Sequence, residues 1–150
     1  MRFLYTVGTT PFNSLTNLII NLYGGKENDI FMQTACCIGT GSIKSIDFSS
    51  DFRSILDSYD IVVTHAGAGS IYSLLEQGKR LVVVPNTDRD DQHQVEIAKY
   101  VEDNNFALVC WNLDELENCL DKVKSHSFER YTKDEFFMYD EINRVIDESK

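Results

Sequence analysis

Short apolar runs alternate with amphipathic segments along most of this chain. The apolar runs are bounded by glycine, proline or polar residues, which predicts buried parallel strands at residues 3–7, 30–35, 43–46, 61–63, 81–84 and 106–110. Between them apolar residues recur at helical spacing, which predicts helices at residues 15–22, 52–56, 70–77, 95–101 and 113–123. Pro11 suits the first turn of the first helix, and Gly24 and Gly25 end it. This alternation predicts an α/β fold, a Rossmann-like doubly wound parallel sheet with right-handed crossovers.

The turn after the fourth predicted strand holds the strongest candidate for chemistry. Gly67 and Gly69 lie where the next helix begins with unpaired N–H groups, and such helix ends bind phosphate. The pattern is not GxGxxG, because Tyr72 stands at the third glycine position, and no P-loop lysine follows. The alternative is a tight structural turn. His65 and Ser70 make the turn more polar than packing alone requires.

A second glycine turn follows the first predicted strand. Gly8, Thr9 and Thr10 would supply backbone N–H groups and two hydroxyls beside the central turn if the two strands are neighbours. We therefore expect contact with phosphate or acceptor here. The alternative is an ordinary loop between a strand and a helix.

The loop after the fifth predicted strand is dense with polar groups. Gln92, His93 and Gln94 offer the donors and acceptors that sugar hydroxyls require, although His93 alone could be a solvated side chain. Asp88 and Asp90 resemble a pair of acids that holds a divalent metal against a nucleotide diphosphate. We reject a metal site, because acids before a helix are expected from the helix dipole and a helix N-terminus holds phosphate without metal. No metal or other cofactor is expected.

Composition limits the classes of partner. The chain has 150 residues and a net charge of −10, which argues against nucleic acid or anionic lipid as the main partner. Its four cysteines lack zinc-finger spacing and include an adjacent pair, which favours buried thiols in a reducing, cytoplasmic compartment. The N-terminal apolar run is too short for a signal peptide, and no run approaches the length of a membrane span. Any role at a membrane is expected to come through a partner.

The chain is predicted to divide into a domain at residues 1–125 and a helical tail at residues 126–150. The tail carries many apolar and aromatic side chains among its charges, namely Phe128, Tyr131, Phe136, Phe137, Tyr139, Ile142, Val145 and Ile146. These side chains could dock another chain. The alternative is that they pack on their own domain.

Four sequence segments together resemble the donor-binding half of family 28 glycosyltransferases. They are VVTHAGAGS, LVVVPN, DDQHQ and DFSSDFRSILDSYD, and the similarity runs from Phe3 to about Cys110 with a fainter match at residues 127–130. Within that family the chain resembles the soluble subunits of two-part N-acetylglucosaminyltransferases that add the second sugar to the dolichol-linked precursor. The resemblance implies the C-terminal half of a GT-B fold, with a membrane-anchored subunit supplying the half that binds the lipid-linked acceptor.

The resemblance also implies a residue set for each part of a UDP-sugar. The diphosphate would bind the turn of Gly67, Ala68, Gly69 and Ser70, with His65 beside it. The uracil would bind the backbone near Phe48 and Ser49. The sugar would bind Gln92, His93 and Gln94.

One position departs from the family pattern. The family carries an acid for the ribose hydroxyls five residues before the position of Gly78, where this chain has Ser73. Glu76 lies one helical turn later and could reach the ribose instead.

The implied reaction is a metal-independent transfer of N-acetylglucosamine from UDP-N-acetylglucosamine with inversion at the anomeric carbon. The leaving diphosphate would be stabilised by N–H dipoles at the glycine turn. No residue stands out as the general base, so we expect the partner to supply or position it. The chain would act at the cytosolic face of a membrane, the endoplasmic reticulum if the source is eukaryotic. Two alternatives are a bacterial capsule or exopolysaccharide transferase subunit that uses another UDP-hexose, and a non-catalytic nucleotide-sugar binding module.

Overall fold

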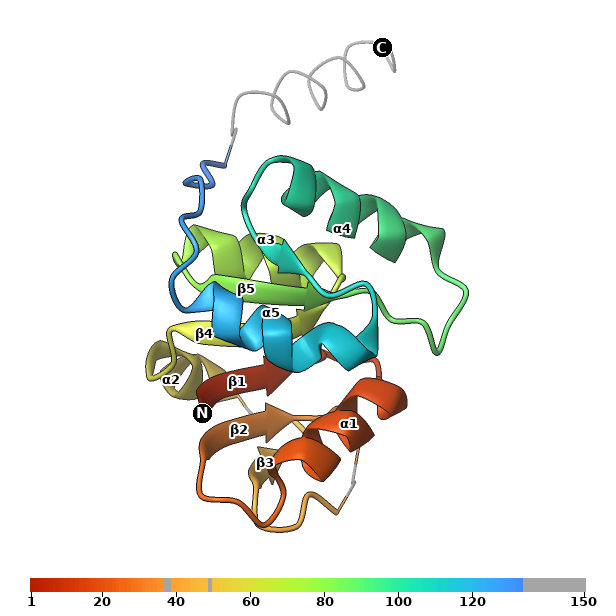
Figure 1. Cartoon of the computed structure of the whole chain (residues 1–150), viewed down its shortest axis with the longest axis vertical. Helices are drawn as coiled ribbons and strands as arrows, with labels where there is room; N and C mark the ends of the chain where they lie inside the picture. Colours follow the sequence, from red (N-terminus) through yellow and green to blue (C-terminus); the bar gives the residue numbers. More distant parts are fainter. Residues whose placement is uncertain (37–38, 49, 134–150) are drawn as a thin grey trace, which may run out of the picture.

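The computed structural model describes residues 1–36, 39–48 and 50–133. They form a six-stranded sheet with the order β3-β2-β1-β4-β5-β6, in which every neighbouring pair is parallel (Figure 1). The strands are β1 (Arg2–Thr6), β2 (Asp29–Gln33), β3 (Lys44–Ile46), β4 (Ile61–His65), β5 (Arg80–Val84) and β6 (Leu108–Val109). The predicted doubly wound α/β fold is confirmed.

Helices cover both faces of the sheet. They are α1 (Asn13–Tyr23), α2 (Phe52–Asp57), α3 (Ala68–Glu76), α4 (Gln92–Asp103) and α5 (Leu116–Val123), the last preceded by the 3-10 turn η1 (Leu113–Glu115). Apolar residues of α1 and α5 pack on one face, and those of α2, α3 and α4 on the other. Figure 1 shows α1 and α5 in front of the sheet and α3 behind it.

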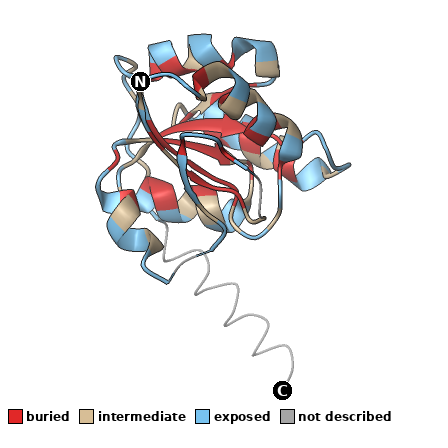
Figure 2. Ribbon diagram, turned by 90° about the horizontal axis from the view of Figure 1, so that it is seen from below, coloured by how far each residue is buried: buried red, intermediate tan, exposed pale blue. Residues whose placement is uncertain are grey.

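The core lies on the two sides of the sheet because successive strand residues point to opposite faces. In β1, Phe3 and Tyr5 face α1 and α5, whereas Leu4 faces the other helix layer, and all three are fully buried. Figure 2 shows the central strands largely buried and the helices exposed on their outer sides, whereas the edge strand β3 has no buried residue. Burial on both faces explains why the strands are apolar runs and not alternating patterns.

The first helix departs from its predicted start. Pro11 precedes the helix, whose first residue is Asn13, so the prediction that Pro11 lies in the first turn is wrong. The Ser14 backbone N–H donates to Asp88 Oδ2 at 3.0 Å, and the Ser14 hydroxyl contacts Asp88 Oδ1. A carboxylate from the distant loop after β5 therefore caps this helix, which a local pattern does not encode.

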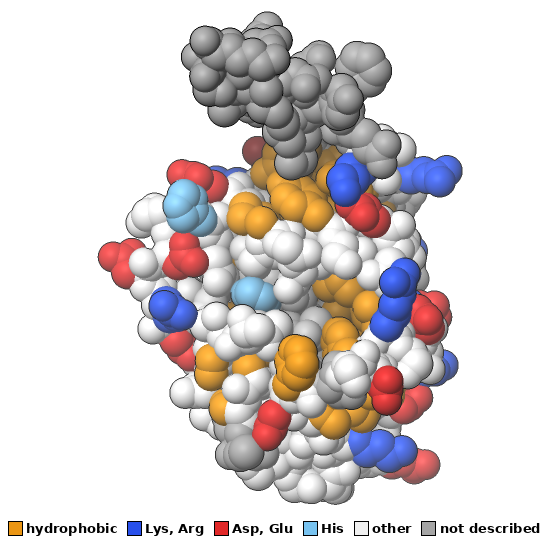
Figure 3. All heavy atoms as spheres, turned by 180° about the vertical axis from the view of Figure 1, so that it is seen from behind, with side chains coloured by type: hydrophobic (Ala, Val, Ile, Leu, Met, Phe, Trp, Pro, Cys, Tyr) orange, Lys and Arg blue, Asp and Glu red, His pale blue; other side chains and the backbone are white. Residues whose placement is uncertain are grey.

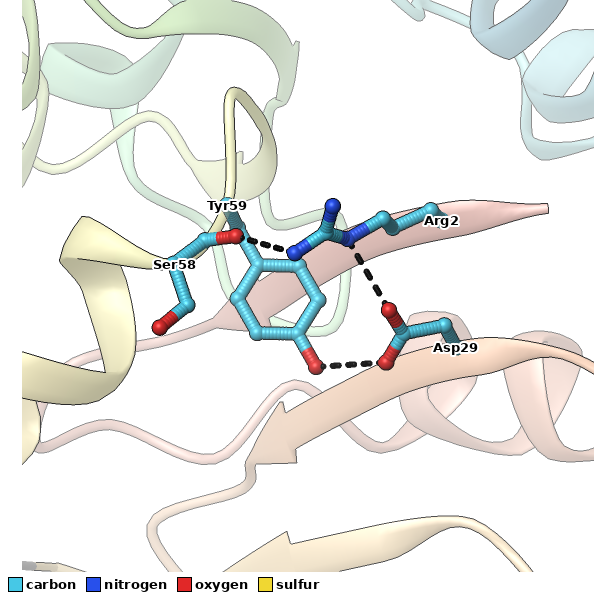
Figure 4. Close-up of polar contacts among 4 residues, drawn as sticks. All are labelled: Arg2, Asp29, Ser58 and Tyr59. Carbon is cyan, nitrogen blue, oxygen red and sulfur yellow. Dashed lines mark hydrogen bonds and ion pairs between the residues drawn. The ribbon is translucent and has the colours of Figure 1, made fainter.

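A polar cluster ties α2 to the N-terminal ends of two strands (Figure 4). Arg2 Nε lies 2.9 Å from Asp29 Oδ2, and its Nη2 donates to the Ser58 carbonyl at 2.6 Å. The Tyr59 hydroxyl donates to Asp29 Oδ1 at 3.0 Å, and the Arg2 guanidinium lies over the Tyr59 ring. These contacts hold the C-terminal end of α2 beside the starts of β1 and β2. The first turn of α2 therefore lies at the other edge, where the strands end.

The described part of the tail packs on the domain. The Arg80 Cζ atom lies 5.1 Å from the centroid of the Phe128 ring. The Tyr131 ring stacks on the Tyr72 ring with 5.7 Å between their centroids. The Glu129 N–H also donates to the Asn105 carbonyl at 3.0 Å. Packing on the chain's own domain therefore holds for residues 126–133. The remaining tail residues named above lie outside the described residues, so docking of a partner there stays a prediction.

Candidate functional site

A cavity of about 740 Å³ lies on the side of the sheet that α2 and α3 cover. From β1 the chain adds β2 and β3 toward one edge of the sheet, and from β4 it adds β5 and β6 toward the other edge. The strand order therefore reverses between β1 and β4, which is where ligands of such sheets bind. The cavity is lined from that point by Thr6, Gly8, Thr9, Gln33, Phe48, Phe52, Arg53, Leu56, Gly69, Ser70, Ser73, Leu74, Glu76 and Gln77. Figure 3 shows this face, with hydrophobic side chains around a hollow near its centre.

The turn after β4 leads directly into α3. Gly67 is the residue before the helix, and within the described chain no side chain caps it. The first bond of the helix runs from the Ile71 N–H to the Gly67 carbonyl at 3.0 Å, so the N–H groups of the preceding residues are open to a ligand. Gly69 and Ser70 line the cavity at this end. The helix dipole adds partial positive charge there, which suits an anion.

Glycines in the turns after β1 and β4 let the backbone of each turn lie close to neighbouring side chains. A Cβ on Gly67 would lie 2.3 Å from His65 Cε1, so only glycine fits beneath the ring. Gly8 has φ +63, and a Cβ there would lie 3.5 Å from Ser70 Oγ and 3.6 Å from His65 Nε2. Gly69 has no atom within 4 Å of such a Cβ and faces open space. The β1 and β4 turns therefore meet, as the sequence predicted for neighbouring strands.

His65 lies at the junction of these turns. Burial lowers its pKa below the ordinary value of 6.5, against a smaller opposite effect of the Asp91 carboxylate, so the ring is neutral at physiological pH. Its Nδ1 is buried without a partner among the described residues, whereas Nε2 lies 3.5 Å from Ser70 Oγ. A buried N–H without an acceptor is rarer than a buried acceptor without a donor, which favours the proton on Nε2. His65 therefore presents a donor toward the turn.

Sequence reasoning missed Gln33, which lies at the floor of the cavity. Its Oε1 accepts hydrogen bonds from Thr6 Oγ1 at 2.7 Å, Val7 N at 3.3 Å and Gly8 N at 3.0 Å. Its Nε2 donates to the Gly8 carbonyl at 2.8 Å and to the Asp47 carbonyl at 2.7 Å. The only signal in the sequence was a glutamine inside an apolar strand.

Gln33 changes the expected role of the first turn. The Gly8 N–H already donates to Gln33, so this group is not free for phosphate as the sequence suggested. Thr9 lines the cavity, while Thr10 is not among its lining residues. A phosphate contact from Thr9 or Thr10 stays a prediction.

Phe48 and the later turns of α3 line another part of the cavity. Phe48 lines it and is 79% exposed, as a flat apolar surface at the rim, while Ser49 lies outside the described residues. Ser73 and Glu76 line the same cavity. Glu76 is the one acid among the described residues that line the cavity, and the Gln77 amide donates to the Ser73 carbonyl at 2.9 Å.

The residues expected to bind the sugar separate into two groups. Gln92 and His93 are exposed at the start of α4 and are not among the residues that line the cavity. Gln94 is buried, and its Oε1 accepts from Ala66 N at 3.2 Å and Asn86 N at 2.8 Å. The oxygen of Gln94 therefore joins the ends of β4 and β5, and its expected sugar contact stays a prediction.

A parallel sheet of this order, with a cavity and an open helix N-terminus at its reversal point, defines a Rossmann-like domain with a candidate ligand site. The chain belongs to the family described as the glycosyltransferase family 28 C-terminal domain, whose profile matches residues 4–145. It is thus a glycosyltransferase-family domain with the fold of one half of a GT-B enzyme.

Several relatives carry the same name, UDP-N-acetylglucosamine transferase subunit ALG13. The one from Yarrowia lipolytica is 29% identical over 126 residues, which cover 73% of this chain and 64% of the relative. The one from Homo sapiens is 31% identical over 123 residues, covering 70% of this chain and 10% of the relative. The one from Saccharomyces cerevisiae is 46% identical over 66 residues, covering 41% of this chain and 33% of the relative. The chain thus spans from a tenth to just under two thirds of these relatives.

Solved structures show the same fold. A solution structure of ALG13 has a TM-score of 0.59 at 20% identity and covers 93% of this chain and 92% of that one. MurG from Acinetobacter baumannii has a TM-score of 0.62 at 19% identity and covers 83% of this chain and 41% of that one. No described helix is long and apolar enough to cross a membrane.

Proposed function

We propose that this chain is the donor-binding subunit of a UDP-N-acetylglucosamine transferase that acts on a polyprenyl or dolichyl diphosphate-linked sugar. The observation that carries the proposal is the open N-terminus of α3 at one end of a cavity placed at the reversal point of the sheet. The family of the chain and the name shared by its relatives support the choice of donor.

The donor would lie in the cavity in one direction. Its diphosphate would accept hydrogen bonds from the first-turn N–H groups of α3, with Ser70 and the His65 Nε2 beside it. Uracil would lie toward Phe48. Glu76 would bind the ribose hydroxyls in place of the acid that the family carries at the position of Ser73. The sugar would extend out of the cavity toward the exposed start of α4.

The reaction would be a direct displacement at the anomeric carbon with inversion. Negative charge develops on the leaving diphosphate, and the fixed N–H dipoles of α3 stabilise it without reorganising. The helix end thus supplies the positive potential that a metal supplies elsewhere, and we propose that no metal takes part. Asp88 belongs to the pair of acids for which a metal site was considered and rejected above, and its carboxylate accepts from the Ser14 N–H at the start of α1.

A general base must accept the proton of the acceptor hydroxyl. We assign none to this chain, because His65 faces the diphosphate end and His93 lies beside Glu96 on the exposed helix start. We propose that the base comes from, or is positioned by, a membrane-anchored acceptor-binding subunit. That subunit would also bring this chain to the cytosolic face of the endoplasmic reticulum membrane.

The test is a transfer assay with the chain alone and with its acceptor-binding partner, using radiolabelled UDP-N-acetylglucosamine and a lipid diphosphate-linked N-acetylglucosamine. We expect transfer only with both subunits, in the presence of EDTA, and a β-linked product by NMR. Full transfer by the chain alone would contradict the partner dependence. Preferred use of another UDP-hexose would favour a capsule-type transferase, and donor binding without turnover in the complex would favour a non-catalytic module.

A further inference from the structure

The cavity has little charge of its own for an anionic ligand. Among its described lining residues only Arg53 and Glu76 are charged. Lys133 Nζ lies 3.8 Å from Glu76 Oε1, so the carboxylate already has a cationic neighbour. The whole chain carries a net charge of −10, which repels an anion unless positive charge is placed near it.

Arg53 is positioned to act across the cavity from α3. It lies in the first turn of α2, which starts at the strand edge where β3 ends, and α3 starts at the same edge after β4. Phe52 and Leu56 of the same helix pack toward the sheet, whereas the Arg53 side chain is exposed and lines the cavity. The two helix starts thus face the cavity from its two sides.

Arg53 also has no carboxylate partner among the residues that the structure describes. Within the described residues its guanidinium forms no ion pair, whereas Arg2 pairs with Asp29, and Arg80 donates to two main-chain carbonyls. A guanidinium is a planar array of donors that matches the oxygens of a phosphate group and keeps its charge at any physiological pH. An unpaired arginine in an otherwise weakly charged nucleotide cavity is therefore available for the ligand.

We propose that Arg53 binds the diphosphate of the nucleotide-sugar from the α2 side, opposite the N-terminus of α3. The inference rests on the proposed function, because it requires a nucleoside diphosphate in this cavity. Arg53 would hold the leaving group between a mobile cation and fixed N–H dipoles, and it would determine affinity for phosphate more than for uridine.

The test compares UDP with uridine on the full chain and on Arg53→Gln, with affinities from calorimetry for UDP and NMR titration for uridine. We expect Arg53→Gln to weaken UDP binding roughly tenfold, the effect of one charged hydrogen bond, and to leave uridine binding unchanged. Arg53→Lys should keep part of the UDP affinity. The UDP dissociation constant of the wild type should also rise with NaCl more steeply than that of Arg53→Gln.

Arg130→Gln is the matched control, because Arg130 is exposed, undergoes the same change of charge and does not line the cavity. It should bind UDP like the wild type. Unchanged UDP affinity in Arg53→Gln, or an equal loss for uridine, would overturn the inference. Failure of the wild type itself to bind UDP would instead overturn the proposed function on which it rests.

Discussion

Replacing Gln33 by methionine tests whether one buried amide holds the proposed donor cavity in shape. The change conserves volume but removes the acceptor of three hydrogen bonds and the donor of two. The Thr6 hydroxyl can turn to other acceptors, and Gly8 is only partly buried, so water reaches some of the freed groups. A buried polar group left unpaired costs about 1–3 kcal/mol, and with two such groups we expect a loss of about 3 kcal/mol in the free energy of unfolding.

Urea unfolding followed by the fluorescence of Trp111, the only tryptophan, measures this loss, with circular dichroism as a second probe. The midpoint of thermal unfolding should fall by roughly 10 °C. UDP affinity should fall too, since the Gly8 turn and the loop before Phe48 lose their common anchor. Gln77→Met is the control for the unfolding measurements, because Gln77 follows α3 directly and its amide bonds only to Ser73 of that helix.

Gln33→Glu separates the acceptor role of the Gln33 amide oxygen from the donor role of its nitrogen. The carboxylate keeps an acceptor for the Gly8 N–H but faces the carbonyls of Gly8 and Asp47, which should raise its pKa above the ordinary value of about 4.3. An acid whose pKa is raised by folding destabilises the protein above that pKa and does so less as pH falls through it. If Gln33→Met unfolds within about 0.5 kcal/mol of the wild type and binds UDP equally well, the reasoning is refuted.

Three further substitutions test the geometry around the cavity. Gly67→Ala should lower stability by about 1–3 kcal/mol, because its Cβ would overlap the His65 ring, whereas Gly69→Ala should raise it by up to about 1 kcal/mol; equal effects in thermal unfolding would contradict this. Because burial lowers the pKa of His65, the unfolded state takes up more protons, so stability should fall as pH drops below about 6.5; an unchanged pH profile in His65→Asn would argue against this cause. Asp88→Ala should cost about 1 kcal/mol through loss of the α1 cap, and a urea midpoint equal to that of the wild type would show that the cap adds nothing.

The sheet could be predicted from the sequence because strands buried on both faces leave continuous apolar runs. Parallel order followed from the alternation of these runs with helices. The glycine turn at α3 was also recognisable, since it lies between two such elements and its chemistry is local. Boundaries moved by up to three residues where main-chain hydrogen bonds, not side-chain patterns, end an element.

The polar contacts that fix the site could not be predicted in the same way. Gln33, Gln94 and Asp88 each bind groups from 8 to 74 residues away, so their partners depend on the finished topology. The sequence placed Gln94 with the sugar because it follows His93, but in a helix neighbouring residues point about 100° apart, and Gln94 turns into the core. Arg53 was passed over because an exposed arginine in a short helix carries no distinctive pattern.

Calorimetric titration of the full chain with UDP-N-acetylglucosamine, in EDTA and then in magnesium, tests most directly that this domain holds a nucleotide-sugar by its own backbone. The account predicts binding at one site in EDTA, a dissociation constant unchanged by magnesium, and weaker binding of UDP-galactose. Absence of binding both alone and with the acceptor-binding partner would contradict it, as would binding that requires the metal.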